Sequence, residues 1–366
     1  MPKNIQSVLG QDNIAGTFEA VVPSLPQDLP AEYYAMHKQV FGRSVVYHKT
    51  TGTRKNAPLN IYNGKSAGVD GLGIDGVPVN CMFSNFHWNV QPEDLLNLAD
   101  AGSNVRTDFS ISEIMRQLAF HKQKQQNLRV SAIHMALLTG AIYADADGYL
   151  LSSSSGAVLV NEDFGVPAGN QDQLLDEAGA TIIDASWATS TTAISTHLRK
   201  IKATARQRTG VELTYAVYGA NVLDYILRNT RVQALMQSNP MLTQTGQTGE
   251  LPEDLMGFKW IPGDVMFWED EDGTKTSLVG EDEVKFLPSM SVGSTWFENI
   301  EGSYPVADSV DMSDEAGAIQ GLAFPSGMTA QSKLEDDPVG AKIIHRDCFL
   351  PTLLNPAAVY YADVTP

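Results

Sequence analysis

Residues 110–140 read SISEIMRQLAFHKQKQQNLRVSAIHMALLTG, and this stretch decides the fold. Apolar residues recur at the i, i+3, i+4 and i+7 spacing of a helix through residues 111–118, and the spacing resumes near the end of the stretch. Ser110 or Ser112 can cap the start, and a glycine closes the stretch. The pattern predicts one long helix over residues 110–139.

The middle of this predicted helix, residues 121–127, is polar on every side. At 1.5 Å per residue the whole helix would be about 40–45 Å long. A helix of that length with a solvated middle is typical of an element that bridges two packing partners, rather than one enclosed in a single core. We therefore expect the helix to join two parts of the molecule.

Two segments before the helix are poor in core residues. Residues 23–30 read PSLPQDLP and cannot be helical, because proline lacks the backbone N–H and restrains the residue before it. Residues 1–40 are thus expected to form an extended arm. Residues 41–86 have β-prone ends and a turn-rich interior, which predicts an extended β-hairpin loop.

The rest of the chain mixes helix and strand, so the predicted class is α+β. A hairpin with an Asp-Gly turn is expected over residues 141–151. Helices are predicted over residues 191–208 and 221–237, with a strand between them at 211–218, and this unit would be the centre of a second domain. Residues 340–364 are predicted to form strands with a bend.

Charge is spread unevenly along a chain whose formal net charge is −18. Residues 1–66 carry seven Lys and Arg against four Asp and Glu, whereas residues 251–340 carry four Lys against 19 carboxylates. A basic front and an acidic rear can attract each other within one chain or between copies. The alternative is a solvated acidic surface that only keeps the protein in solution. The acidic balance argues against a protein that coats nucleic acid.

Sequence motifs for catalysis, cofactor binding or metal binding are either absent or lack the neighbouring residues that such a site needs. Residues 71–76 match G-x-G-x-x-G, but Val-Pro-Val follows where a dinucleotide fold needs a helix. Two Asp-rich turns, at 145–148 and 270–273, lack the oxygen ligands of a calcium loop. No nucleophilic side chain and histidine base are separated by a spacing that matches a known catalytic motif. The sequence therefore predicts no catalytic, cofactor-binding or metal-binding residue.

The chain has two cysteines, Cys81 and Cys348. They are too few for a disulfide framework and fit a reducing compartment, although a single bridge between them stays open. Their spacing relative to His87 and His345 matches no common zinc pattern. The first residues contain no apolar run of the kind found in signal peptides, and no run is long enough to span a bilayer.

Several segments together resemble the tailed-bacteriophage major capsid proteins of the lambda type, the capsid protein E family. The resemblance covers nearly the whole chain from about residue 30, and it depends on the order and spacing of motifs that are individually weak. These motifs are LTGAIYADADG at 138–148, the helix–strand–helix stretch at 191–236 with RQRTG and ANVLDY, DVMFWEDEDG at 264–273, KFLPS at 285–289 and RDCFLPTLLNPAAVYYADV at 346–364.

The resemblance implies a tailed-phage major capsid fold with four parts. These would be an N-terminal arm, an extended β-hairpin loop, a peripheral domain built on a long spine helix, and an axial domain. On this sequence they map to the arm at 1–40, the loop at 41–86, the peripheral domain at 87–160 with returning strands at 311–366, and the axial domain at 161–310.

The implied function is that of a major shell protein, not an enzyme. Copies would assemble into hexamers and pentamers of an icosahedral head that encloses double-stranded DNA without binding it tightly. Expected partners are further copies of the chain, a scaffold, a portal and a decoration protein, with assembly in the host cytoplasm and residence in the virion. The alternatives are another virion assembly or decoration protein, or a two-domain hydrolase.

Five basic residues of the predicted loop are candidates for contact with the next subunit: Arg43, Lys49, Arg54, Lys55 and Lys65. They would meet the acidic surface of a neighbouring copy. Surface ion pairs contribute only about 0–1 kcal/mol each, so these charges are expected to set register, while apolar contacts and strand addition supply most of the affinity. Replacing Arg54 and Lys55 with Glu should weaken assembly without unfolding the subunit.

Overall fold

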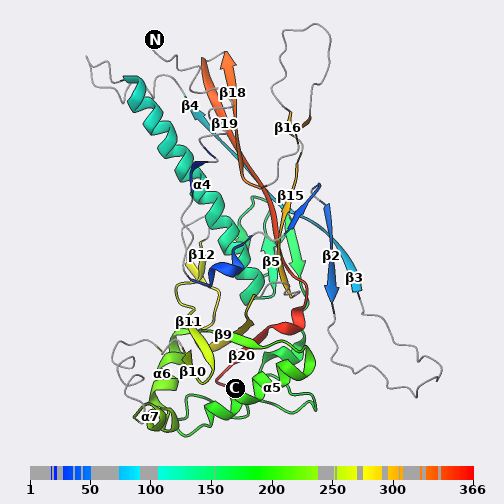
Figure 1. The fold of residues 1–366 in the computed structure, drawn as a ribbon, viewed down its shortest axis with the longest axis vertical. Coiled ribbons are helices and arrows are strands. Elements are labelled where there is room, and N and C mark those ends of the chain that lie inside the picture. Colours follow the sequence, from blue (N-terminus) through cyan, green and yellow to red (C-terminus); the bar gives the residue numbers. More distant parts are fainter. Residues whose placement is uncertain are drawn as a thin grey trace, which may run out of the picture.

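A 33-residue helix, α4 (Arg106–Leu138), runs beside a long, mainly antiparallel sheet and forms the upper part of an elongated molecule, above a lobe that holds the other helices (Figure 1). The structure is a computed structural model. It describes residues 18, 20–22, 28–35, 38–42, 44–50, 74–90, 106–151, 153–237, 251, 254–269, 275–290, 296–304, 306–307, 322–323, 327–336 and 339–366.

The long sheet is organised around one central strand, β19. Residues 341–346 of β19 pair with β18 and also with β4, so these two strands lie on opposite edges of it. Phe349 pairs with both β15 and β4, which puts β15 on the β18 side. The five strands are β1 (Lys38–Val40), β15 (Phe297–Gly302), β19 (Val339–Leu353), β18 (Thr329–Asp336) and β4 (Met82–Val90).

The lower lobe has its own six-stranded sheet, in the order β10-β11-β9-β14-β20-β8. Three helices pack around it: α5 (Ile194–Arg208), α6 (Ala220–Arg228) and α7 (Thr230–Gln237). The strands are β8 (Gln171–Asp172), β9 (Leu213–Tyr218), β10 (Asp254–Leu255), β11 (Phe258–Pro262), β14 (Glu283–Pro288) and β20 (Tyr360–Asp363).

Smaller elements complete the described residues. They are the hairpin β2 (Ser44–Thr50) and β3 (Ile74–Asn80), the sheet of β5 (Ala141–Ala144), β6 (Leu150–Leu151) and β7 (Val160–Asp163), the pairs β12 (Phe267–Glu269) with β13 (Lys275–Ser277) and β16 (Val306–Ala307) with β17 (Leu322–Ala323), and the 3-10 turns η1 (Ala31–Tyr33), η2 (Ala168–Asn170) and η3 (Pro356–Ala358).

Two strands cross the segment boundaries expected from the sequence. β15 falls within 161–310, yet it pairs with the last five residues of β19 in the long sheet. β20 falls within 311–366, yet it pairs with β14 in the sheet of the lower lobe. Because β19 is 15 residues long and ends at a bend that η3 continues, one stretch of chain serves both sheets.

Helix α4 bridges two apolar clusters, as its pattern predicts, but its polar middle is only partly solvated, with Lys124 and Asn127 exposed and other residues buried. Ile114 and Leu118 belong to a small upper cluster, and the last turns belong to the large central one. Between them Gln125 and Arg129 are buried against the sheet rather than exposed. Buried polar groups of this kind are usually hydrogen-bonded within the protein. Arg129 has such partners in the cluster described below, whereas Gln125 Nε2 and Oε1 have none among the described residues.

The predicted helix over residues 221–237 is divided in two at Asn229. The Asn229 backbone is extended, and its side-chain Oδ1 accepts hydrogen bonds from the N–H groups of Arg231 and Val232 at 3.1 and 3.3 Å. Asn229 therefore ends α6 and caps the start of α7. An asparagine favours a cap over a helix interior, because its side chain competes for backbone hydrogen bonds.

Candidate assembly surface

The strands β2 and β3 pair in antiparallel register over seven residues, from Ser44 opposite Asn80 to Thr50 opposite Ile74. Alternate side chains of β2 point to opposite faces, as strand geometry requires. Val45 and Tyr47 are buried, whereas Val46 is 51% exposed. The hairpin thus has one face against the body of its own chain and one face exposed.

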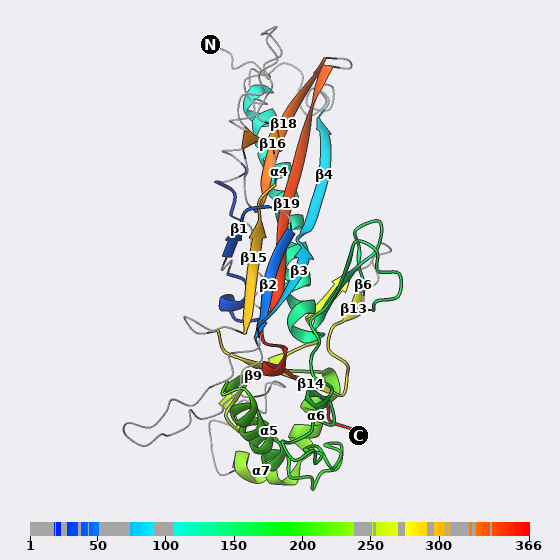
Figure 2. The same cartoon turned by 90° about the vertical axis from the view of Figure 1, so that its right-hand side faces the viewer.

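The inner face of this hairpin is fastened to β7 and the residues after it. The Tyr47 hydroxyl donates a 2.6 Å hydrogen bond to Glu162 Oε1, and its ring meets Phe164 edge-on at 6.2 Å. Burial raises the pKa of Tyr47, and the nearby Glu162 carboxylate raises it further, so the phenol keeps its proton as a donor. Figure 2 shows the hairpin running alongside the long sheet.

Of the five basic residues proposed from the sequence as subunit contacts, Lys49 is described by the structure, and Arg43, Arg54, Lys55 and Lys65 lie outside the described residues. Lys49 Nζ donates a 3.4 Å hydrogen bond to the Asp163 carbonyl and sits 6.0 Å from the Tyr47 ring centre. Its ammonium therefore has contacts within its own chain.

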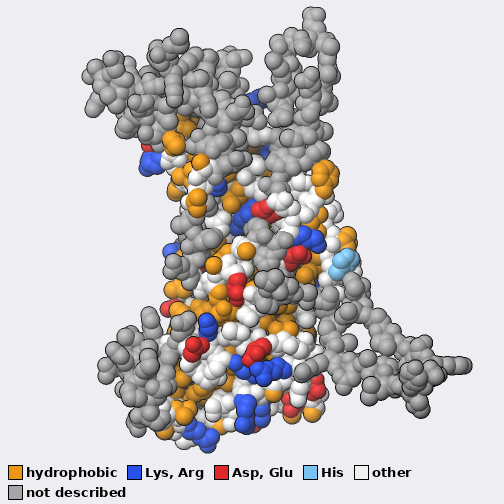
Figure 3. Space-filling model, viewed as in Figure 1, with side chains coloured by type: hydrophobic (Ala, Val, Ile, Leu, Met, Phe, Trp, Pro, Cys, Tyr) orange, Lys and Arg blue, Asp and Glu red, His pale blue; other side chains and the backbone are white. Residues whose placement is uncertain are grey.

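The basic residues 1–66 and the acidic residues 251–340 also form an ion pair within one chain. Lys38 Nζ lies 3.6 Å from Glu298, which pairs a residue of the basic front with one of the acidic rear. In the view of Figure 3, Lys and Arg side chains gather over the lower lobe. The helix α5 of this lobe carries five Lys and Arg residues and no carboxylate.

One edge of the long sheet has no partner strand among the described strands. β4 pairs along its length with β19, and its other edge faces a groove of about 640 Å³ beside the β5–β6 hairpin. Val158 and Leu159 near this groove are 70% and 61% exposed. An open strand edge next to exposed apolar side chains is a surface that favours addition of another strand. The groove is lined by residues 80–86 and by Leu128, Ala144, Asp147, Gly148, Tyr149, Leu150, Leu159 and Val160.

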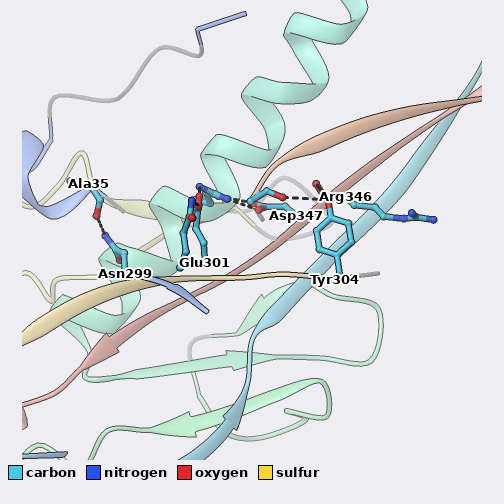
Figure 4. A network of polar contacts seen from close by, with 9 residues as sticks. Ala35, Asn299, Glu301, Tyr304, Arg346 and Asp347 are labelled. Carbon is cyan, nitrogen blue, oxygen red and sulfur yellow. Dashed lines mark hydrogen bonds and ion pairs between the residues drawn. The ribbon is translucent and has the colours of Figure 1, made fainter. Parts of the chain in front are cut away.

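A buried ion-pair cluster joins α4 to the long sheet behind this edge (Figure 4). Arg129 donates two hydrogen bonds to the Asp347 carboxylate, at 2.7 and 2.5 Å, and one to Glu301 Oε1 at 3.0 Å. Burial raises the pKa of Asp347, and the Arg129 guanidinium opposes that effect. Sequence analysis missed the cluster, although Arg129 lies just after the polar run of the helix and Asp347 is a carboxylate within the strand β19.

Residues 28–35 of the predicted arm lie against the body of the chain. The Tyr33 hydroxyl donates a 2.5 Å hydrogen bond to the Pro288 carbonyl. Asn299 Nδ2 donates hydrogen bonds to the carbonyls of Tyr33 and Ala35, at 2.7 and 2.8 Å. Figure 4 shows the bond to Ala35. The Tyr34 hydroxyl and His134 Nε2 are 2.7 Å apart. This part of the arm is thus fixed to α4, β14 and β15.

A histidine pair lies between the helix and the sheet in the upper part, with His345 buried and His121 half-buried. His121 Nδ1 and His345 Nε2 are 3.1 Å apart, and the Phe86 ring stacks on His345 at 5.0 Å. Burial, with a smaller contribution from His121, lowers the pKa of His345 to about 3. Burial also lowers the pKa of His121. Both rings are therefore neutral at pH 7.

The described part of the chain shows neither a metal-ion cluster nor a helix suited to cross a membrane. Among its residues, no group of three or more His, Cys, Asp or Glu side chains is placed to hold a metal ion. Within the same residues, no helix combines the length and the apolar character that crossing a membrane requires. The surface thus combines the open edge of β4, the arm residues 28–35 held against the body, and the buried ion pairs between α4 and the long sheet.

Comparison with known proteins identifies this arrangement. The family model for phage major capsid protein E matches residues 18–364. Among solved structures, the chain is similar to a prophage protein from E. coli that is provisionally assigned as a capsid protein, with 12% identity, a TM-score of 0.51, and 92% of this chain and 93% of that one covered. This likeness supports the predicted α+β capsid fold.

Two further solved structures are similar at lower scores. A phage-related protein from Bordetella bronchiseptica has 10% identity, a TM-score of 0.48, and 97% of each chain covered. A chain of the mature capsid of bacteriophage PhiM1 has 9% identity, a TM-score of 0.46, and 93% of this chain and 88% of that one covered. No curated protein matches the sequence.

Proposed function

The chain belongs to the phage major capsid protein E family, and we propose that its copies form the hexamers and pentamers of an icosahedral head that encloses double-stranded DNA. Members of this family are shell-forming structural proteins and not enzymes, which sets aside the hydrolase alternative. The decoration-protein alternative is disfavoured because the family match runs from residue 18 to 364 of a major capsid protein.

The observation that carries this proposal is the open edge of β4 beside the groove. A second copy of the chain is the occupant: its extended hairpin segment adds along β4 and places apolar side chains over Val158 and Leu159. The contact is heterologous, since the hairpin of one copy meets the sheet edge of the next, and such contacts form rings when the rotation between copies closes. Each copy would offer both surfaces, as a repeating shell requires.

The basic loop residues Arg43, Lys49, Arg54, Lys55 and Lys65 would orient this contact. The charge difference between residues 1–66 and residues 251–340 supports an attraction between the loop of one copy and the acidic surface of the next. Lys49 would act at the base of the loop, where it already contacts Asp163 of its own chain. The other four lie outside the described residues and stay candidates from the sequence alone.

The remaining partners follow from what a phage head must do. A scaffold and a portal would guide closure in the host cytoplasm, a decoration protein would bind the finished virion, and DNA would fill the interior. The formal net charge of −18 supports an interior that holds DNA without tight contacts to its phosphates.

A pair of substitutions tests the docking surface. Leu159→Glu adds a charge at the groove, and Val265→Glu adds the same charge at a 46% exposed valine outside the residues that line the groove. In an expression system where the wild type yields particles, Leu159→Glu should shift most of the protein to small species in sedimentation, whereas Val265→Glu should retain particles. Equal particle yields for both variants would contradict the proposed contact.

A further inference from the structure

The two cysteines of the chain, 267 positions apart in sequence, meet at Gly302. A Cβ atom at Gly302 would lie 2.7 Å from Cys348 Sγ and 3.1 Å from Cys81 Sγ. The two sulfur atoms are therefore no farther apart than the sum of those distances. Both side chains are buried, Cys81 at 3% and Cys348 at 0% exposure, and the structure holds them as thiols.

The two cysteines lie where the extended hairpin joins the long sheet. Cys81 is the single residue between β3, which belongs to the extended hairpin, and β4, which belongs to the long sheet. Cys348 lies on the central strand β19, opposite Phe83 of β4. The absence of a side chain at Gly302 of β15 leaves room for both sulfurs between the strands.

Access to the two thiols is unequal. Cys81 is one of the residues that line the groove beside β4, whereas Cys348 is fully enclosed behind it. A small solute in the groove therefore reaches Cys81 first. Cys81 thus lies on the groove side with Cys348 behind it, which is the spatial order that a reacting and a resolving cysteine need.

We propose that Cys81 and Cys348 form a redox clasp, an intrachain disulfide that closes when a hydroperoxide enters the groove. The hydroperoxide transfers an oxygen atom to the Cys81 thiol, giving a sulfenic acid, and is itself reduced to an alcohol or to water. The Cys348 sulfur then attacks the sulfenic sulfur; the S–S bond forms, the S–O bond breaks and water leaves. The protein loses two electrons and two protons overall, and the hydroperoxide accepts both.

The clasp would fix the point where the hairpin leaves the long sheet. It ties the start of β4 to the middle of β19, across a very long stretch of sequence, and so restricts the unfolded chain as well as the separation of these strands. In a reducing cytosol the thiols persist, and the bond forms once the protein meets oxidising surroundings. This inference rests on the positions of the sulfurs and does not depend on the contact proposed between subunits.

The test uses the full chain in its unassembled form, treated with hydrogen peroxide and then denatured and alkylated. Peptide mapping without reductant should find the Cys81 peptide joined to the Cys348 peptide within one chain, with both sites lost to alkylation together. In Cys348→Ala, Cys81 should stop at a sulfenic acid that dimedone captures. In Cys81→Ala, Cys348 should stay fully open to alkylation after denaturation.

Each other result overturns the clasp. Cys348 that remains alkylatable in oxidised wild type, a link between two chains, or two thiols that never react would each contradict it. Because the wild-type peptide map needs no variant, a cysteine substitution that fails to fold leaves the test intact. Oxidised wild type should also unfold at a higher temperature than reduced wild type, and the shift should disappear when reductant is added.

Discussion

Arg129 of α4 and Asp347 of β19 form a two-point ion pair in the interior, with side-chain exposures of 4% and 0%. The two residues are 218 positions apart, and the guanidinium also reaches Glu301 of β15. The helix is thus attached to two strands of the long sheet through a single side chain. A buried charge that loses its partner is costly, so this pair is a point of high sensitivity.

Replacing Asp347 with Ala should therefore lower the free energy of unfolding by about 3–5 kcal/mol, because Arg129 would be left buried with Glu301 alone. Urea unfolding of the unassembled subunit measures this loss. Glu113→Ala is the control, since it removes a surface pair with Arg116 at 2.7 Å and should cost at most about 1 kcal/mol. The double variant Arg129→Met, Asp347→Leu should recover much of the loss. Equal costs for the two single Ala variants would contradict the role of the cluster.

The buried histidines predict that the subunit loses stability in acid. Burial lowers the pKa of His345 to about 3 and that of His134 to about 4, against about 6.5 for an unfolded histidine. As pH falls below about 6.5, the unfolded chain takes up protons that the folded chain refuses, so the free energy of unfolding decreases.

Each of these histidines should add a slope of about 1.4 kcal/mol per pH unit between about pH 4 and pH 6, and little above pH 7. His345→Phe should remove one such contribution from the pH profile measured by urea unfolding. A variant profile parallel to that of the wild type across this range would show that His345 is not excluded from protonation by the fold.

Gly302 should be intolerant of a side chain because two sulfurs occupy the space beside it. Gly302→Ala should cost about 1–3 kcal/mol through overpacking. In a Cys348→Ala background the same change should cost about 1 kcal/mol less, because the sulfur nearest to the new methyl group is gone. A double-mutant cycle measured by urea unfolding under reducing conditions gives this difference. Additive costs would mean that the sulfurs do not define the space.

The base of the hairpin should loosen when its hydrogen bond is removed. Tyr47→Phe loses the contact with Glu162 and should lower the local opening free energy of β2 by about 1.5 kcal/mol. Hydrogen exchange of the β2 amides measures this change. Val46→Ala, on the exposed face of the same strand, is the matched control and should leave the exchange rates unchanged. Faster exchange in the control alone would reverse the assignment of the two faces.

The elements that depend on local pattern could be predicted from sequence. The long helix was expected over 110–139 and is found over 106–138, with Ser110 and Ser112 inside it rather than at its cap. Serine is favoured at a cap but also tolerated within a helix, so the start signal was ambiguous. The Asp-Gly turn after β5 and the hairpin character of residues 44–80 likewise follow from short-range turn chemistry.

The elements that depend on distant partners could not be predicted in this way. The burial of Arg129, just after the polar run of α4, could not be predicted from sequence, because the carboxylate that pairs with it comes from residue 347. The placement of β15 in the long sheet and of β20 in the lower sheet follows from the length of β19. Hydrophobic periodicity carries no information about which strands pair with each other. The meeting of the two cysteines at Gly302 likewise depends on distant parts of the chain, because Cys81, Cys348 and Gly302 come from three different segments.

Electron cryomicroscopy of particles formed by the wild-type chain tests the central claim most directly. The account predicts closed shells of hexamers and pentamers in which a segment of a neighbouring copy lies along the open edge of β4 and covers Leu159. Particles in which that edge and the groove face solvent in every subunit would contradict it.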